Sequence, residues 1–509
     1  MKGGRAPGRT TGIHRVRGES VDMASVKPGE SKCLVGVILA AGRGVRAYPT
    51  TQFIPKVLIE VDGTSLLERN IELLRDQLGV REVIIVIGYL GDKIREALHG
   101  KELGVKIGFV EQVEQKGIGN ALLMLENQVA GRRFAVILGD ELYIGSNHSK
   151  LLSYLDREYD AVLTFRCEKN RAKISKNFTG VIDGNRVLSL TEKPKDPKAN
   201  LMGLGSYLLT PKVFDYVRST PASELRGEIE ITDVLSNMAA EGIVLACVLD
   251  GNYVNVTSTD DINYANYLWR QGKFPEYRVS VVIPAYNEEG TIAHVVHEFQ
   301  SHDAVHEVLV VDNNSKDGTS RAASDAGARV VVEKEQGYGC ALRRGMDEAS
   351  GDIMILTEAD GSFRSKDIPK FLEYLKDSDM VMGTRTTRDM IEQGANMYPL
   401  LRWGNVFFGK FVEALWWSCQ PRFTDVGCTY RALWKSTYQK IRPLLRARGP
   451  EFSPEMMIAI LVSKKRVIEI PVSYYRRIGG ESKHSKTIWG AAKTALRMLR
   501  LTMKYRVRY

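Results

Sequence analysis

Short runs of apolar, mostly β-branched residues alternate with segments of helical periodicity along most of the chain. In the first half, such runs predict strands at Val35–Leu39, Val83–Ile87, Val105–Val110, Ala135–Leu138 and Ala161–Phe165. In the second half, they predict strands at Val279–Ile283, Glu307–Val311, Arg329–Val332 and Ile353–Thr357. This alternation is typical of the α/β class, with Rossmann-like, mostly parallel sheets. Ligands of such sheets bind at the carboxyl ends of the strands.

The pattern divides the chain into two units of this kind. The 509 residues suffice for two or three domains, and we interpret residues 271–277, which contain glycine and proline, as a linker. We therefore predict domains at residues 33–270 and 278–487. Residues 1–32 are rich in Gly, Arg and Ser and lack the apolar core of a signal peptide, so we expect a disordered tail.

The last segment, residues 488–509, has helical periodicity and two different faces. The apolar face carries Ile488, Ala492, Ala495, Leu499 and Met503. The basic face carries Lys493, Arg497, Arg500 and Lys504. A basic amphipathic helix of this kind can lie on an anionic bilayer. It can equally pack on its own domain with a solvated basic face, and the periodicity leaves both interpretations open.

Charge is concentrated at the two ends of the chain. The formal net charge is +10; residues 476–509 hold ten Lys or Arg and one Glu, and residues 1–32 hold seven basic and three acidic side chains. Basic ends on a slightly acidic body predict an anionic surface as partner. No stretch of about 18 uncharged apolar residues occurs, so we expect no transmembrane helix. Six cysteines without metal-binding spacing indicate a reducing compartment. We therefore expect a cytoplasmic protein that attaches reversibly to the inner membrane face.

A glycine-rich turn after the first predicted strand gives the first chemical signal. It reads Leu39-Ala40-Ala41-Gly42-Arg43-Gly44-Val45-Arg46, and Pro55-Lys56-Val57-Leu58 follows it. Backbone N–H groups in such a turn can approach phosphates. Together with Gly139-Asp140 at a strand end and Glu192-Lys193-Pro194, these motifs resemble the sugar-1-phosphate nucleotidyltransferases.

This resemblance implies a GT-A-type domain that joins a sugar 1-phosphate to a nucleoside triphosphate, with UTP or dTTP favoured over GTP. Charge that builds on the phosphate oxygens must be neutralised, and the resemblance assigns this role to Arg46, Lys56 and Lys193. It assigns nucleotide contact to Ala41, Gly42, Gly44, Gln112 and Gly117.

The same resemblance implies the sugar and metal contacts. It assigns the sugar to Glu192, Gly203 and Glu230, and a Mg²⁺ or Mn²⁺ ion to Asp140 and Asn255. Taken singly, Asp140 is also explained as a helix cap and Lys193 as an ordinary surface lysine. Six elements in family order over residues 34–268 favour the functional interpretation.

A second strand-and-turn motif opens the second half. It reads Val281-Val282-Ile283-Pro284-Ala285-Tyr286-Asn287-Glu288-Glu289, and a strand that ends in Asp312 follows. These segments resemble the family-2 glycosyltransferases, which implies a second GT-A-type domain with Pro284, Tyr286, Glu288 and Asp312 around the nucleotide. Glu358 and Asp360, at the end of another predicted strand, would hold the metal ion that bridges a donor pyrophosphate. Since the common family form is Asp-x-Asp, we consider Asp360 the stronger ligand and a catalytic residue.

Later motifs suggest the acceptor. Gly383-Thr384-Arg385 and the segment 424–431 are similar to polyprenyl-phosphate sugar synthases, such as the dolichyl-phosphate mannose and glucose synthases. A phosphate acceptor is already an anion, so it needs cations that position it more than a strong general base. The resemblance assigns sugar or acceptor contact to Arg385, Asp425, Arg431, Arg476, Arg477, Ser482 and Lys483.

The two resemblances together predict a bifunctional enzyme. It would make a nucleotide sugar and then transfer the sugar, with inversion, to polyprenyl phosphate at an anionic membrane surface. One alternative keeps both steps with a soluble or polysaccharide acceptor, and a second is a non-catalytic nucleotide-sugar sensor or scaffold. No motif predicts nucleic-acid binding. The sugar, the base and the oligomeric state stay open, a homo-oligomer included.

Overall fold

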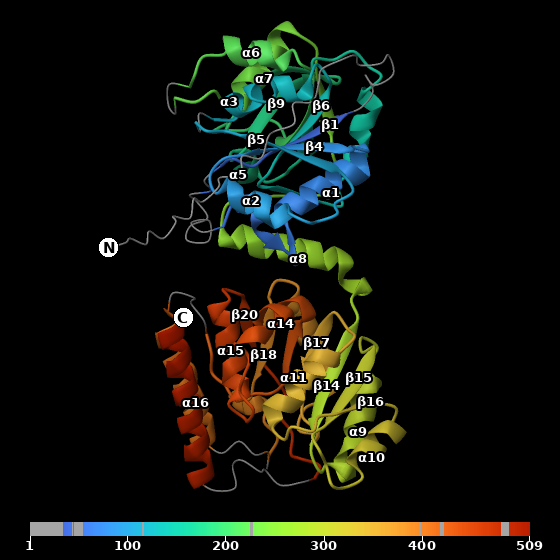
Figure 1. Ribbon diagram of the computed structural model, residues 1–509, viewed down its shortest axis with the longest axis vertical. Helices are drawn as coiled ribbons and strands as arrows, with labels where there is room; N and C mark the ends of the chain where they lie inside the picture. The colour runs from blue at the N-terminus through green and yellow to red at the C-terminus, as the bar shows by residue number, and fades with distance from the viewer. Residues whose placement is uncertain are drawn as a thin grey trace, which may run out of the picture.

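The computed structural model describes residues 34–42, 44, 54–114, 117–223, 227–393, 395, 399–417, 422–479 and 488–509. The chain forms two α/β units, and helix α8 (Thr259–Lys273) lies between them (Figure 1). The first unit runs from blue to green and the second from yellow to red. Within the described residues, no helix is long and apolar enough to cross a membrane.

A nine-stranded sheet forms the centre of the first unit, in the order β5-β4-β1-β6-β11-β8-β12-β10-β9. In chain order its strands are β1 (Val35–Leu39), β4 (Glu82–Ile87), β5 (Lys106–Glu111), β6 (Phe134–Leu138), β8 (Ala161–Cys167), β9 (Phe178–Asp183), β10 (Arg186–Glu192), β11 (Leu201–Leu209) and β12 (Val244–Val248). Within this sheet only β10 and β11 run against the common direction. The predicted mostly parallel α/β sheet is therefore confirmed.

Helices cover both faces of this sheet. They are α1 (Leu66–Leu78), α2 (Gly91–Leu98), α3 (Gly117–Leu123), α4 (Glu126–Val129), α5 (Arg171–Ile174), α6 (Val213–Ser219) and α7 (Ile231–Glu241). Side chains of α1 and α2 pack with Ile38 on one face, and side chains of α6 and α7 pack with Val37 on the other. Neighbouring residues of β1 thus point to opposite cores, as the pleat of a strand requires.

A hairpin and a separate two-stranded sheet complete the first unit. They pair β2 (Glu60–Val61) with β3 (Thr64–Ser65), and β7 (Glu141–Ile144) with β13 (Asn252–Asn255). The hairpin leads into α1, where Ser65 and Glu68 form a reciprocal capping box. The separate two-stranded sheet pairs Asn255 with Glu141, although the two residues lie far apart in the sequence.

A seven-stranded sheet forms the second unit, in the order β16-β15-β14-β17-β19-β18-β20. In chain order its strands are β14 (Val279–Ala285), β15 (Glu307–Asp312), β16 (Arg329–Val332), β17 (Ile353–Leu356), β18 (Met380–Thr384), β19 (Arg431–Trp434) and β20 (Val467–Pro471). Within this sheet only β19 is antiparallel to its neighbours. Its helices are α9 (Glu289–Gln300), α10 (Thr319–Asp325), α11 (Tyr338–Glu348), α12 (Ile368–Leu375), α13 (Pro399–Leu415), α14 (Lys435–Ile441), α15 (Phe452–Val462) and α16 (Ile488–Arg508).

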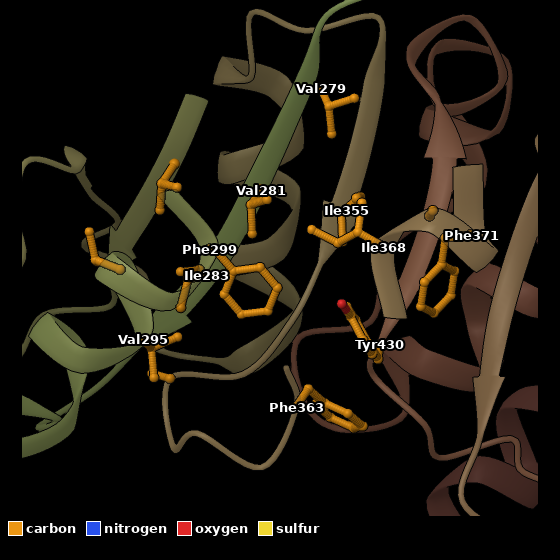
Figure 2. Close-up of a cluster of buried hydrophobic side chains, with 14 of the residues drawn as sticks. Val279, Val281, Ile283, Val295, Phe299, Ile355, Phe363, Ile368, Phe371 and Tyr430 are labelled. Carbon is orange, nitrogen blue, oxygen red and sulfur yellow. The ribbon is translucent and has the colours of Figure 1, made fainter. Parts of the chain in front are cut away.

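Alternate residues of β14 face the two cores of the second unit. Val281 and Ile283 pack on one face with Phe299 of α9 and with Tyr430, as Figure 2 shows. The rings of Phe299 and Tyr430 meet edge to face, with their centroids 6.2 Å apart. Val282 belongs to the core on the other face. Fully burying a side chain of this size stabilises a fold by about 1.5–3 kcal/mol.

Arg270, in the last turn of α8, joins the two units. Its Nε lies 2.9 Å from the Asp62 carboxylate of the first unit, and its Nη1 donates to the carbonyl oxygens of Leu375 and Ser378 in the second. The Tyr277 hydroxyl donates to the other oxygen of Asp62, at 2.8 Å. The segment 271–277 consists of the end of α8, the 3₁₀ turn η6 (Phe274–Glu276) and Tyr277. One buried cation thus contacts both units.

The direction of β14 decides where the second site opens. The strand begins at Val279, two residues after Tyr277, so the amino ends of the parallel strands lie toward α8. Their carboxyl ends lie at the edge that faces away from the first unit (Figure 1).

Candidate active sites

The glycine-rich turn of the first unit begins at the carboxyl end of β1. The Ala40 N–H donates to the Val86 carbonyl of β4, at 2.8 Å, which fixes the start of the turn. Ala41 is buried, Gly42 is exposed, and Gly44 has a φ of 62°, a left-handed conformation that favours glycine. A Cβ on Gly42 would meet no atom within 4 Å, so its backbone is open to a ligand. Arg46 lies outside the described residues.

Lys56 and Asp140 form an ion pair at the same edge of the sheet. Lys56 begins the 3₁₀ turn η4 (Lys56–Leu58), and Asp140 follows β6, 84 residues away in the sequence. The Lys56 side chain is only 9% exposed. The structure therefore brings these two predicted residues together, and the interpretation of Asp140 as a helix cap does not describe this contact.

Asn255 completes this cluster. The Val256 N–H donates to the Asp140 carbonyl, at 3.0 Å, which holds the two segments together. The buried Oδ1 of Asn255 has no hydrogen-bond partner, and an unpaired buried oxygen is costly unless a ligand uses it. One carboxylate and one amide oxygen fit Mg²⁺, which takes oxygen ligands and usually keeps several positions for phosphates and water.

A buried carboxylate that the sequence analysis missed lies behind the cluster. Glu141 accepts from Tyr143, from Tyr253 at 2.8 Å and from the Gly205 N–H at 2.8 Å. Burial, above all, raises the pKa of Glu141 to about 7. Because its partners belong to β7, β13 and β11, Glu141 ties together the strands that carry Asn255 and follow Asp140.

The predicted nucleotide contacts gather beside β5. Gln112 is buried and its amide donates to the Gly117 carbonyl at 3.0 Å and to Asn120 at 3.2 Å. Gly117 has a φ of 84°, and a Cβ there would lie 2.9 Å from that of Glu228. Glu230 lies two residues after Glu228 and is the N-cap residue of α7. In the structure, Gln112 braces this loop through its amide nitrogen.

Of the predicted sugar contacts, Glu192 ends β10 and Gly203 lies in β11, whereas Glu230 lies near Gly117. Lys193 and Glu192 form an ion pair at 2.8 Å, and both side chains are partly exposed. Lys193 has a φ of 44°, an uncommon conformation for a lysine. A Cβ on Gly203 would lie 2.1 Å from the Phe178 ring, so this glycine is required for packing. Phe178 of β9 pairs with Glu192 of β10. Phe178 therefore lies between Gly203, against which its ring packs, and the neighbouring residues Glu192 and Lys193.

The second unit presents its predicted nucleotide residues at the ends of β14 and β15. Asp312 is buried and accepts from the Ser315 N–H at 2.9 Å and from the Ser320 hydroxyl. Pro284 lies in β14, and Tyr286 is the first residue after that strand. The N–H of Glu288 donates to Thr319 at 2.8 Å. The contact between Glu288 and Thr319 brings the two turns side by side.

Glu358 and Asp360 lie next to each other and share one cation. Arg477 is 2.9 Å from Asp360 through Nε and 3.8 Å from Glu358 through Nη2. Asp360 also accepts from the N–H and the hydroxyl of Ser362, and Glu358 accepts from Thr429 at 2.6 Å. Burial and then the charge of Asp360 raise the pKa of Glu358 to about 7. Two adjacent buried carboxylates fit a divalent cation. In the described part of the chain no group of three or more acidic, His or Cys side chains is placed to hold a metal.

Among the predicted acceptor cations, Arg385 is held by a carboxylate. It makes a two-point contact with Asp425, at 2.8 Å and 3.0 Å, and its own N–H donates to the same carboxylate at 3.0 Å. Asp425 is fully buried, and its N–H donates to Glu469 at 2.8 Å. Opposite charge and hydrogen bonds outweigh burial and hold the pKa of Arg385 above its usual value. Its guanidinium is therefore a fixed positive charge.

The remaining cations differ from one another. Arg431 is almost fully buried and donates to the carbonyl oxygens of Cys428, Val426 and Ser453. This differs from the contact with acceptor that we predicted, since its charge supports the 424–430 segment instead. Arg476 is exposed. Ser482 and Lys483 lie outside the described residues.

Comparisons with known proteins divide at the same place as the fold. The sequence model of the nucleotidyl transferase family matches residues 35–271. That of glycosyl transferase family 2 matches residues 280–424.

Curated relatives match the first unit. The UTP–glucose-1-phosphate uridylyltransferase AglF of Haloferax volcanii is 30% identical over 228 residues, which are 44% of this chain and 92% of that protein. A UTP–glucose-1-phosphate uridylyltransferase of Pseudomonas aeruginosa is 30% identical over 282 residues, 48% of this chain and 98% of that protein. The bifunctional protein GlmU of Methanococcus aeolicus is 32% identical over 232 residues, 45% of this chain and 53% of that protein. The chain thus spans about half the length of the GlmU relatives that it matches.

Proposed function

This chain belongs to the nucleotidyl transferase family and carries a glycosyl transferase family 2 domain, and from this premise we propose that it catalyses two consecutive reactions. The first unit makes a nucleotide sugar, and the second unit transfers the sugar to polyprenyl phosphate at an anionic membrane surface. The contact of Lys56 with Asp140, beside the unpaired oxygen of Asn255, is the observation that carries the first reaction.

In the first reaction, an oxygen of the sugar phosphate attacks the α-phosphorus of the triphosphate. The bond from that phosphorus to the β-phosphate oxygen breaks, and pyrophosphate leaves. Lys56 neutralises the negative charge that builds on the α-phosphate, and Arg46 and Lys193 hold the pyrophosphate and the sugar phosphate. We propose UTP as the triphosphate, with dTTP as the alternative, because two relatives are named UTP–glucose-1-phosphate uridylyltransferases.

Divalent cations fit both sites. Asp140 and Asn255 would hold one in the first unit, and Glu358 and Asp360 one in the second. A bound Mg²⁺ or Mn²⁺ ion supplies positive charge to phosphate oxygens.

In the second reaction, a phosphate oxygen of the lipid attacks the anomeric carbon of the sugar. The bond from that carbon to the nucleoside diphosphate breaks, and the configuration inverts. The acceptor is already ionised, so no general base is required. Arg385, oriented by Asp425, and the exposed Arg476 hold the acceptor phosphate, and Arg477 neutralises the leaving diphosphate.

A lipid acceptor is supported by the surface next to Arg385. Glu413 of α13 accepts from the Phe423 N–H, two residues before Asp425. The same helix exposes Trp403 and Phe407, 65% and 74% exposed, one turn apart. Exposed aromatic side chains of this kind are typical of membrane interfaces.

A two-phase assay tests the proposal. The full chain, Mg²⁺, a panel of triphosphates, labelled sugar 1-phosphates and undecaprenyl phosphate are combined, and label is counted in the organic phase. We expect organic label that requires both a triphosphate and the lipid. D140N should abolish the first half-reaction only and D360N the second only, whereas D215N, on the exposed face of α6, should change neither.

Other outcomes separate the alternatives. Label that stays in a water-soluble nucleotide sugar would reject the lipid acceptor and favour a soluble or polysaccharide one. Turnover that neither D140N nor D360N affects would reject both sites. Binding of nucleotide sugars without any turnover would favour a sensor or scaffold.

A further inference from the structure

Helix α16 docks on the second unit through a face that the sequence did not single out. Tyr505 is buried, and its hydroxyl donates to the Leu444 carbonyl and, at 3.0 Å, to the Glu455 carboxylate of α15. Thr502 is fully buried beside it, and Leu501 packs against the core.

The opposite side of α16 carries an apolar stripe that the rest of the domain leaves exposed. It consists of Leu496, Leu499, Met503 and Val507, which are 47%, 38%, 43% and 85% exposed. At about 100° per residue these four positions form one line, roughly opposite Tyr505. The apolar face predicted from the sequence, which includes Leu499 and Met503, therefore points away from the domain. Packing on the domain does not explain this stripe.

A band of cations lies between the stripe and the domain. Arg500, Lys504 and Arg508 follow one another at intervals of four residues, so they line one side of the helix. Together with Arg446, they border a cavity of about 300 Å³ between α16 and the segment that leads into α15. Leu444, Leu501 and Tyr505 contribute its apolar wall.

These four cations have no acidic partners of their own. None of them forms an ion pair with a carboxylate in the part of the chain that the structure describes. The single acidic side chain of the cavity, Glu455, already accepts from Tyr505 and from the N–H groups of Arg446 and Ala447. Like charges one helical turn apart destabilise a helix, and a bound anion would remove that repulsion.

We propose that this cavity binds the phosphate headgroup of an anionic phospholipid while the stripe of Leu496, Leu499, Met503 and Val507 enters the bilayer interface. The geometry matches one ligand, because an anionic lipid presents a phosphate directly beside its apolar chains. A helix with apolar and basic faces side by side binds such a surface through both. This site lies apart from Arg385, Asp425 and Arg477, and it deepens the proposed function by naming what holds the enzyme at the membrane that contains its acceptor.

Sedimentation of the full chain with vesicles tests the inference without any substrate, so its failure is distinct from failure of the proposed function. Vesicles of phosphatidylcholine alone are compared with vesicles that also contain phosphatidylglycerol. We expect binding to the anionic vesicles only, and a loss of affinity of about fivefold or more in R446Q and in K504Q. R506Q is the matched control, because it removes the same charge from α16 but does not border the cavity.

The decisive comparison is R446Q against R506Q. Arg446 is not on α16, so a loss that is larger for R446Q supports a headgroup site. Equal losses in the two variants would show long-range attraction and overturn the site. Binding of glycerol 1-phosphate that depends on Arg446, without vesicle binding, would identify a free phosphate ligand and overturn the lipid. Unchanged binding of a nucleotide sugar to the second unit, which carries all three substitutions, shows that each variant is folded.

Discussion

The Nε of Arg477 lies 2.9 Å from the Asp360 carboxylate, and the same guanidinium reaches toward Glu358. This nitrogen is buried and is not aligned for a hydrogen bond, so charge more than geometry holds the pair. One cation therefore balances two neighbouring acids, and in the proposed transfer reaction it would exchange one of them for a phosphate oxygen.

Replacement of Arg477 should impair the second reaction alone. We expect R477Q to lower sugar transfer about 100-fold, which is the usual effect of removing one group that stabilises developing charge. Transfer from purified nucleotide sugar to polyprenyl phosphate measures this effect. R321Q, which replaces an exposed arginine of α10, is the control. If R477Q transfers sugar at the wild-type rate, Arg477 has only a structural role.

Replacement of Lys56 should impair the first reaction alone. K56M leaves the Asp140 carboxylate without its partner and removes the charge from the reacting phosphates. We expect pyrophosphate release to fall about 100-fold or more, while transfer from added nucleotide sugar stays unchanged. The exposed Lys150 provides K150M as a control, and equal pyrophosphate release by K56M and K150M would remove Lys56 from the mechanism.

Glu141 is expected to act as a positioning residue. In E141Q, the hydroxyls of Tyr143 and Tyr253 and the Gly205 N–H lose their shared carboxylate, so Asn255 is less firmly placed. We expect a fall of about 10–100-fold in activity or metal affinity. The Mg²⁺ concentration that gives half-maximal activity is the discriminating readout, and it should rise. Y253F, which removes one of the three donors, should show a smaller rise; an unchanged Mg²⁺ requirement in E141Q would contradict the role.

His148 should make the first unit less stable in mild acid. Burial lowers its pKa from 6.5 to about 3 in the folded protein, so the unfolded chain takes up the proton first. Stability is therefore lost as the pH falls below about 6.5, and the loss from pH 7.5 to pH 5.5 is about 1.4 kcal/mol. Urea unfolding at both pH values measures it. H148N should lack this part of the pH dependence, and an equal dependence in both proteins would refute the assignment.

Arg270 should stabilise the contact between the two units. R270M leaves the partly buried Asp62 without a cation and removes one of the two donors to the carbonyl of Ser378, the other being Trp434. We expect the free energy of unfolding to fall by about 3 kcal/mol, measured by urea titration. The double variant D62N/R270M should recover part of the lost stability, because no unpaired charge remains. If its loss of unfolding free energy equals the sum of the losses in D62N and R270M, the two residues are not coupled.

Local pattern was sufficient to predict nine of the strands that run in the common direction of the two sheets, but not β9, β12, β18 and β20. Val35–Leu39 and Arg329–Val332 have the predicted bounds, because short β-branched runs between turns identify strands of a parallel sheet; the first is buried and the second lies at the edge of its sheet. Leu201–Leu209 was not predicted. It contains Gly203 and Gly205, and the packing of Phe178 and the hydrogen bond to Glu141 justify these glycines only in the folded protein.

Motifs predicted which residues gather, but not how each one is used. Lys56 and Asp140 meet as expected, whereas Arg431 turns inward to three backbone carbonyls. The sequence contains no signal for the inward orientation of the Arg431 side chain, since this orientation depends on where the 424–430 segment and α15 lie in the fold. The same limit applies to α16. Its period predicts a helix, but Leu501, Thr502 and Tyr505 rather than the predicted apolar face make the docking contact.

The second sheet carries its site at the edge that faces away from the first unit. A nucleotide sugar released by the first unit must travel around the second one, over a path at least as long as β14, about 20 Å. Under the proposed function, the intermediate would be open to solution on the way and would mix with the cellular pool of that compound. The fusion would then keep the two catalysts in equal number without reserving the intermediate for the second unit.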